Sequence, residues 1–145
     1  MKNIFLLLSL GLSLVSVRCS NVETNEIEKG NEQASQNTKH INKDVNVTEF
    51  AELINTGEGQ ILDVRTPEEW AEGSIAGAKK MNFFDDTFND QLSKLDKTKP
   101  VYVYCKSGGR SGKAAKKMDK MGFTKIYNLT GGITAWNDAG KPTIK

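Results

Sequence analysis

Short apolar runs alternate with amphipathic stretches over most of the chain. The runs at residues 60–64, 101–104 and 125–129 are bounded by turn residues, and weaker strand signals occupy residues 44–47 and 78–83. Mainly apolar runs of this length are typical of strands that are buried on both faces of a parallel sheet. The pattern predicts about five strands in a central, mainly parallel sheet.

Helical patterns fill the intervals between these runs. Thr48 is the expected N-cap of a first helix that ends at Gly57, and Thr66 and Pro67 begin a short second helix. Further helices are predicted at residues 85–95, at residues 132–139 and along the apolar stripe of Ala114, Ala115, Met118 and Met121. Strands that alternate with helices indicate a three-layer α/β fold, with helices on both faces of the sheet.

The N-terminus has the features of a secretory signal. A short basic start at Lys2 precedes an apolar stretch over residues 4–17, which is too short to span a bilayer comfortably. We expect residues 1–19 to act as a signal sequence. The protein is then expected to be exported to the cell envelope, in the periplasm or attached to a membrane.

Cys19 directly follows the apolar stretch and is a candidate lipidation site. A cysteine at this position resembles the lipid-modified cysteine of bacterial lipoproteins, although Arg18 departs from the small residue that usually precedes it. Ordinary cleavage with release of the protein is the alternative. An acyl anchor would attach the protein to a membrane without changing its chemistry.

Residues 20–40 are almost entirely polar, and we expect them to form a disordered tether before a single domain at residues 41–145. The chain has 20 basic and 18 acidic side chains, and loss of Lys2 and Arg18 with the signal leaves 18 of each. This balance gives no indication of nucleic-acid binding. Since no apolar stripe beyond the core faces is evident, we expect a monomer.

Cys105 is the only cysteine of the predicted domain. It follows the run at residues 101–104 and begins the sequence Cys-Lys-Ser-Gly-Gly-Arg-Ser at residues 105–111. A strand that ends at a cysteine, turns through glycines and continues into a helix directs backbone N–H groups and the positive helix end at the sulfur. Such surroundings lower a thiol pKa and favour the reactive thiolate, so Cys105 is the candidate nucleophile.

Three ordered motifs give the chain a family resemblance. The loop has the form Cys-x-x-Gly-x-Arg-Ser at residues 105–111, residues 62–78 contain Leu-Asp-Val-Arg and Gly-Ser-Ile-Ala-Gly-Ala, and residues 131–142 contain Gly-Gly-Ile-Thr-Ala-Trp. Together they resemble the active loop, the first signature and the closing signature of single-domain rhodaneses, which are sulfurtransferases. Ser74 and Ala76 stand where the first signature usually has His and Pro, and we take both as turn residues away from sulfur transfer.

The resemblance implies sulfur transfer through a persulfide on Cys105. The thiolate would attack the outer sulfur of a donor such as thiosulfate or another persulfide, and would then pass that sulfur to cyanide or a thiol. The only histidine, His40, lies in the expected tether, so the nucleophile depends on a lowered pKa rather than on a histidine base. No metal-ligand cluster or nucleotide motif is present, so we expect no metal and no cofactor.

The remaining loop residues are expected to bind the substrate, and an earlier motif to support the loop. Arg110 offers a planar charge suited to a sulfonate, although it could instead pair with a nearby carboxylate, and Ser111 is as well suited to capping the helix as to donating to a ligand. Asp63 and Arg65 are expected to brace the loop and the sheet. The substrate-binding candidates are Lys106, Ser107, Gly108, Gly109, Arg110 and Ser111.

Two other function classes remain open from the sequence. One is a module of the same fold that binds a partner, or carries a persulfide, without turnover. The other is a phosphatase or arsenate reductase, but the loops of those enzymes have one residue more between Cys and Arg than the four at residues 106–109. The physiological sulfur donor and acceptor are not indicated by any motif.

Overall fold

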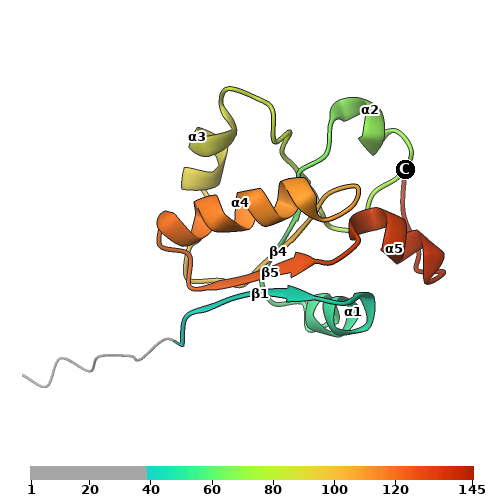
Figure 1. Ribbon diagram of the computed structural model, residues 1–145, viewed down its shortest axis with the longest axis horizontal. Coiled ribbons are helices and arrows are strands. Elements are labelled where there is room, and N and C mark those ends of the chain that lie inside the picture. The colour runs from blue at the N-terminus through green and yellow to red at the C-terminus, as the bar shows by residue number, and fades with distance from the viewer. Residues whose placement is uncertain (1–38) are drawn as a thin grey trace, which may run out of the picture. The chain divides into compact units, whose positions relative to one another are not determined.

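The structure is a computed structural model that describes residues 39–145. Its elements are, in order, β1 (Ile41–Val45), α1 (Val47–Asn55), β2 (Gln60–Asp63), α2 (Pro67–Trp70), β3 (Lys79–Lys80), α3 (Phe88–Ser93), β4 (Val101–Tyr104), α4 (Gly109–Lys120), β5 (Lys125–Leu129) and α5 (Gly132–Asp138). The five strands have the order β1-β5-β4-β2-β3, and every neighbouring pair is parallel. The predicted α/β fold with a central parallel sheet flanked by helices is confirmed (Figure 1).

The sheet separates two hydrophobic clusters. On one face Val101 and Val103 of β4 pack with Leu92 of α3 and Met118 of α4. On the other face Tyr102 and Tyr104 pack with residues of α1 and α5 that include Phe50 and Trp136. Successive side chains of a strand point to opposite faces, so a fully buried strand such as β4 contributes to both clusters. Figure 1 shows α3 and α4 on the side of the sheet opposite α1.

The topology places Cys105 at the carboxyl end of the middle strand. β4 lies between β5 and β2, and the chain leaves it at Cys105 to enter α4 four residues later. The turn passes through Gly108, whose φ of 94° is in the left-handed region that favours glycine. In open parallel sheets ligands bind beyond the carboxyl ends of the strands, so the fold itself marks this loop as a candidate site.

The first strand and helix begin earlier than the sequence pattern predicts. The strand occupies Ile41–Val45 instead of residues 44–47, because its backbone pairs in register with β5 from Ile41 to Val45. The predicted N-cap at Thr48 is wrong, since the side chain of Asn46 accepts a hydrogen bond from the backbone amide of Glu49 at 2.9 Å. Asn caps a helix at least as well as Thr, so α1 starts two residues sooner.

The segment between β2 and β4 is less regular than predicted. The strand expected at residues 78–83 is reduced to Lys79–Lys80, because only these two residues pair with β2. The helix expected at residues 85–95 is shortened to Phe88–Ser93, since the side chain of Asp85 accepts from the backbone amide of Thr87 and forms a turn before it. The predicted apolar face is nevertheless present, and its buried residues are Phe88, Leu92 and Leu95.

The predictions for the N-terminal part concern residues outside those described. The signal sequence at residues 1–19, the lipidation candidate Cys19 and residues 20–38 of the tether all fall there. Among the residues that are described, no helix has the length and apolar character needed to cross a membrane.

Candidate active site

Cys105 is buried at the start of the loop, and hydrogen-bond donors surround its sulfur. The residue is only 1% exposed, and its side chain accepts a hydrogen bond from the backbone amide of Gly108 at 3.1 Å. The hydroxyl of Ser111 lies 3.5 Å from the sulfur and 3.1 Å from the carbonyl oxygen of Gly108. A hydroxyl has one proton, so Ser111 donates to one of these two acceptors at a time.

These donors lower the pKa of the Cys105 thiol. Burial is the largest single effect and opposes ionisation, but hydrogen bonds from the Ser111 hydroxyl and from the backbone amides of Ser111, Ser107 and Gly108 together outweigh it. The pKa of Cys105 is therefore below its ordinary value. A thiol in this state is a better nucleophile near neutral pH, because only the thiolate attacks.

Ser111 is a helix residue rather than the cap that was one of its two predicted roles. The N-cap of α4 is Gly108, and Ser111 is fully buried in the first turn of the helix. Its hydroxyl instead contacts the sulfur. The start of α4 thus supplies both backbone amides and one side-chain donor to Cys105.

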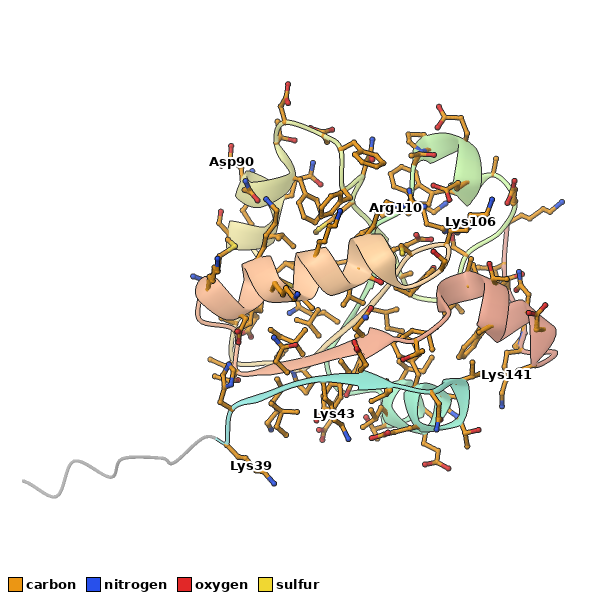
Figure 2. The ribbon with its side chains drawn as sticks, viewed as in Figure 1. Lys39, Lys43, Asp90, Lys106, Arg110 and Lys141 are labelled. Atoms are coloured by element: carbon orange, nitrogen blue, oxygen red, sulfur yellow. The ribbon has the colours of Figure 1, made fainter. Side chains whose placement is uncertain are left out.

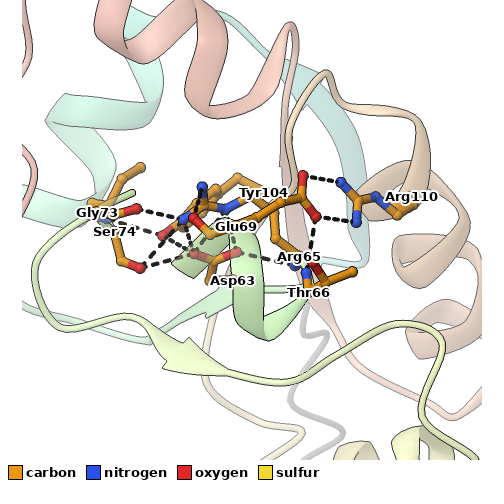
Figure 3. Close-up of polar contacts among 9 residues, drawn as sticks. Asp63, Arg65, Thr66, Glu69, Gly73, Ser74, Tyr104 and Arg110 are labelled. Atoms are coloured by element: carbon orange, nitrogen blue, oxygen red, sulfur yellow. Dashed lines mark hydrogen bonds and ion pairs between the residues drawn. The ribbon is translucent and has the colours of Figure 1, made fainter. Parts of the chain in front are cut away.

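The two cations of the loop have different surroundings. Figure 2 shows Lys106 and Arg110 near the beginning of α4, and Lys106 is exposed. Arg110 is held by Glu69 of α2 through two hydrogen bonds, from Nη1 to Oε2 at 2.6 Å and from Nη2 to Oε1 at 2.7 Å (Figure 3). Of the two roles that the sequence left open for Arg110, the structure therefore places it in a bidentate ion pair.

Glu69 is positioned by hydrogen bonds from the two residues that precede α2. Its Oε2 atom also accepts from the backbone amide of Thr66 at 3.0 Å, and its backbone carbonyl accepts from Nη1 of Arg65 at 2.9 Å. The hydrogen bonds from Arg110 are the main cause of a fall in the pKa of Glu69 to about 2, against a smaller opposing effect of burial. Glu69 therefore carries its negative charge at every physiological pH.

A buried ion pair next to α2 joins Asp63 and Arg65, the two residues that the sequence suggests as supports of the loop and the sheet. The two residues are 0% and 2% exposed, and Nη2 of Arg65 donates to Oδ2 of Asp63 at 2.7 Å. The hydroxyl of Tyr104 donates to the same Oδ2 at 2.8 Å and accepts from the backbone amide of Ile75 at 3.0 Å. Burial and the neighbouring carboxylate raise the pKa of Tyr104, so its hydroxyl keeps the proton that it donates. The hydrogen bond from Tyr104 to Asp63 thus joins the end of β4, directly before Cys105, to β2.

The Asp63–Arg65 ion pair also binds the segment at Gly73 and Ser74. The Ser74 hydroxyl donates to Oδ2 of Asp63 at 3.2 Å, and Nη2 of Arg65 donates to the carbonyl oxygen of Gly73 at 2.6 Å. Ser74 also exchanges two backbone hydrogen bonds of 2.8 Å with Ile144, so the end of the chain lies against this turn. Ser74 therefore forms an isolated antiparallel bridge with Ile144 beside the Asp63–Arg65 pair, and its having no part in sulfur transfer stays a prediction. Figure 3 shows Ser74 next to Asp63 and Arg65.

His40 is placed away from Cys105. Its Nε2 atom lies 2.8 Å from a carboxylate oxygen of Asp119, near the C-terminal end of α4, whereas Cys105 lies at the N-terminal end of that helix. Trp136 is buried in the core, edge to face with Phe50. Among residues 39–145, no group of three or more His, Cys, Asp or Glu side chains is arranged to hold a metal ion.

Residues 46–139 match the family model of the rhodanese-like domain. The chain belongs to the rhodanese-like family. It is 34% identical over 92 residues to a sulfurtransferase of Allochromatium vinosum, a match that covers 63% of this chain and 84% of that protein. It is also similar to the crystal structure of a rhodanese-like domain protein from Staphylococcus aureus, with 34% identity and a TM-score of 0.60 over 71% of this chain and 99% of that one.

The chain spans less than two thirds of two other relatives that it matches. The chain is 39% identical to the uncharacterized protein YqhL of Bacillus subtilis over 54% of its own length, and spans 61% of that protein. It spans only 36% of the rhodanese-like/PpiC domain-containing protein 12 of Arabidopsis thaliana, to which it is 36% identical.

Two residues of the site were not singled out for these roles from the sequence. Glu69 lies in the stretch that resembles the first family signature and is an acidic residue in the first turn of a short helix, three positions after Thr66, but neither feature indicates Arg110 as its partner. Tyr104 is part of an apolar strand run, where nothing indicates that its hydroxyl bonds to Asp63. Both contacts join segments 41 residues apart in sequence, so no local pattern reports them.

Proposed function

We propose that the protein is a sulfurtransferase that carries sulfane sulfur as a persulfide on Cys105. The observation that supports this most strongly is the sulfur of Cys105 at the start of α4, buried among backbone amides and the Ser111 hydroxyl, with a lowered pKa. The sulfurtransferase of Allochromatium vinosum supports the same reaction class.

The proposed reaction has two steps. The Cys105 thiolate attacks the outer sulfur of a donor such as thiosulfate, the S–S bond of the donor breaks, and its electron pair leaves with sulfite. The new persulfide anion then gives its outer sulfur to cyanide, which leaves as thiocyanate while Cys105 returns to the thiolate; a thiol acceptor would be sulfurated in the same way. Charge balances in both steps, and the amides that surround the sulfur are suited to stabilising its negative charge throughout.

Phosphate-ester chemistry is less well supported. The loop has four residues between Cys105 and Arg110, one fewer than the loops of phosphatases and arsenate reductases. A loop of this length suits a sulfur-bearing donor better than a tetrahedral phosphate.

The decisive experiment is intact-mass spectrometry of the purified protein after incubation with thiosulfate or an organic persulfide, with the adduct mapped by peptide digestion. One added sulfur on Cys105 is expected, and Cys105→Ser should lose both the adduct and thiocyanate formation. Cys19→Ser is the matched control and should retain both. The proposal would be overturned by the absence of an adduct with every donor, above all if the protein hydrolyses p-nitrophenyl phosphate.

We also propose that the protein is exported to the cell envelope. The support is the basic start and apolar stretch of residues 1–19, which are followed by a polar segment. Mass spectrometry of the N-terminus from membrane and periplasmic fractions distinguishes the two routes. An acylated Cys19 in the membrane fraction indicates a lipoprotein, a free new N-terminus indicates release, and an intact Met1 in the cytoplasm contradicts export.

A further inference from the structure

The Ser111 hydroxyl has two acceptors for its one proton, and only one of them is the reactive sulfur. Its oxygen lies 3.5 Å from the sulfur of Cys105 and 3.1 Å from the carbonyl oxygen of Gly108. A serine inside a helix ordinarily donates to the carbonyl three or four residues before it, which here is that of Gly108. Ser111 is fully buried, so solvent offers no third acceptor. The proton is therefore directed to the sulfur when other donors already occupy the Gly108 oxygen.

Two other donors do occupy the Gly108 carbonyl oxygen. The backbone amide of Gly112 donates to it at 2.9 Å, in the first turn of α4. The side-chain nitrogen Nδ2 of Asn128 donates to the same oxygen at 3.5 Å. A carbonyl oxygen has two lone pairs, so these two donors use its capacity. The hydrogen bond from Asn128 is long, and its effect is to occupy the oxygen rather than to add much strength of its own.

Asn128 is a polar residue in a buried strand. It lies in β5 between Tyr127 and Leu129 and is only 6% exposed. A buried amide costs free energy unless its polar atoms have hydrogen-bond partners. The oxygen Oδ1 of Asn128 has none among residues 39–145. The structure thus uses the nitrogen end of this side chain, and we attribute the presence of the amide to what the nitrogen binds.

The sheet holds the Asn128 nitrogen beside the loop. Asn128 is in register with Asp44 of β1 on one side and with Val103 of β4, two residues before Cys105, on the other. Its Nδ2 atom has two N–H groups and donates to Oδ1 of Asp44 at 2.7 Å as well as to Gly108. Both partners are acceptors, so both require the nitrogen instead of the oxygen on this side of the amide.

We propose that Asn128 is a positioning residue that directs the Ser111 hydroxyl to the Cys105 sulfur by occupying the carbonyl oxygen of Gly108. The inference rests on the proposed sulfurtransferase function for its purpose, since the directed hydroxyl favours the thiolate that attacks the sulfur donor. Without the Asn128 nitrogen, the hydroxyl returns to the Gly108 carbonyl and the sulfur loses one of its donors.

The charged groups near the loop are retained when Asn128 is substituted. Arg110 of α4 interacts with the sulfur and is paired with Glu69 of α2, and Lys106 is an exposed residue of the loop. Asp44 is the charged residue that Asn128 itself contacts. Its influence therefore has to be measured separately from that of the amide.

The test is Asn128→Leu, which keeps the branched shape of the side chain and removes both polar atoms. The rate of Cys105 alkylation by iodoacetamide, mapped by peptide digestion, is measured across pH because it follows the thiolate fraction. On the acidic side of the profile we expect about three- to tenfold slower alkylation than in the wild type, and equal rates at high pH, where both thiols are ionised. Asn128→Ala also lacks the donor and replaces Asn128→Leu if that variant does not fold.

Two further variants identify the cause. Asn128→Leu combined with Ser111→Ala should have the profile of Ser111→Ala alone, because Asn128 acts through that hydroxyl. Asp44→Ala breaks only the other hydrogen bond of Asn128. It should not slow alkylation, since the loss of a negative charge favours the thiolate.

The outcomes separate this inference from the proposed function, because alkylation requires no sulfur transfer. If the wild type takes sulfur from no donor, the sulfurtransferase proposal fails while the alkylation profiles still test Asn128. The role of Asn128 is wrong if Asn128→Leu has the wild-type profile, or if its alkylation remains slower at high pH. It is also wrong if the double variant is slower than Ser111→Ala, or if Asp44→Ala slows alkylation as much as Asn128→Leu does.

Discussion

Gly132 packs directly against the carbonyl group of Cys105. A Cβ atom added at Gly132 would overlap that carbonyl oxygen and would lie 2.5 Å from the carbonyl oxygen of Lys106. The next residue, Ile133, donates its backbone amide to the carbonyl oxygen of Cys105 at 2.8 Å, and the amide of Thr134 donates to Lys106 at 3.1 Å. The start of α5 therefore supports the backbone from which the nucleophile projects.

This contact predicts that Gly132→Ala damages both stability and activity. The φ of Gly132 is 59°, so alanine has the cost of a left-handed conformation in addition to the overlap with the loop. We expect a loss of roughly 2–4 kcal/mol in the free energy of unfolding, measured by urea denaturation. Sulfur transfer should slow by about tenfold or more, because the displaced loop misplaces the sulfur.

Gly122→Ala is the matched control for this substitution. Gly122 also has a positive φ, of 87°, but nothing lies within 4 Å of an added Cβ. It should lose only the roughly 1–2 kcal/mol of the backbone conformation and retain full activity. Equal losses for the two variants would show that the contact with the loop has no special role.

Ser111→Ala is predicted to make Cys105 less acidic. The Ser111 hydroxyl is the largest of the contributions that lower the pKa of the thiol, so its removal raises that pKa. The rate of alkylation by iodoacetamide follows the thiolate fraction and increases as the pH rises through the pKa. The rate profile of Ser111→Ala should therefore be shifted to higher pH, with several-fold slower alkylation at neutral pH.

Ser107→Ala, in the same loop, is the matched control for this measurement. Ser107 contributes to the pKa of Cys105 through its backbone amide, which Ser107→Ala retains. Its alkylation profile should coincide with that of the wild type. A shift of the same size in both variants would attribute the effect to a general disturbance of the loop instead of the Ser111 hydroxyl.

The central strands could be predicted from sequence, but the edge of the sheet could not. β4 and β5 occupy the runs predicted for them, since strands buried on both faces are mainly apolar. β3 has only Lys79 and Lys80, both exposed, and it exists because β2 offers two residues of free edge for pairing. Such a strand has no pattern of its own, so the sequence predicts a longer strand than the one that forms.

In the candidate site, too, the local features could be predicted from sequence and the contact between distant segments could not. The donors around Cys105 could be predicted, because a strand, a glycine turn and a helix start are local features. The partner of Arg110 could not, since Asp63, Glu68, Glu69 and Glu72 are all carboxylates of one short segment. Glu69 is selected by the way α2 lies over the beginning of α4, which is a result of tertiary packing.

Tyr104→Phe is predicted to destabilise the fold. The hydroxyl bridges Asp63 and the backbone amide of Ile75, and its removal leaves that buried amide without this acceptor. A loss of about 1–3 kcal/mol is expected in urea denaturation. Tyr127→Phe is the control, because no hydrogen bond of the Tyr127 hydroxyl is found in the described residues, and it should change stability by no more than about 0.5 kcal/mol. Equal effects would contradict a bridging role for Tyr104.

The pairing of Glu69 with Arg110 is predicted to stabilise the fold in a pH-dependent way. The pKa of Glu69 is lowered from 4.5 to about 2 in the folded protein, so its contribution is fully present above about pH 4.5. As the pH falls from about 4.5 to about 2 the contribution is lost, because the unfolded chain binds the proton first.

A double-mutant cycle isolates this contribution. The free energies of unfolding of the wild type, Glu69→Gln, Arg110→Gln and the double variant give the coupling energy between the two residues at each pH. We expect the same favourable coupling at pH 7 and pH 5.5, and a clearly smaller one at pH 3, where part of the pH-dependent stabilisation is already lost. A coupling energy that is equal at pH 3 and pH 7 would show that the Glu69 pKa is not depressed by Arg110. A coupling near zero throughout would show that the ion pair does not stabilise the fold.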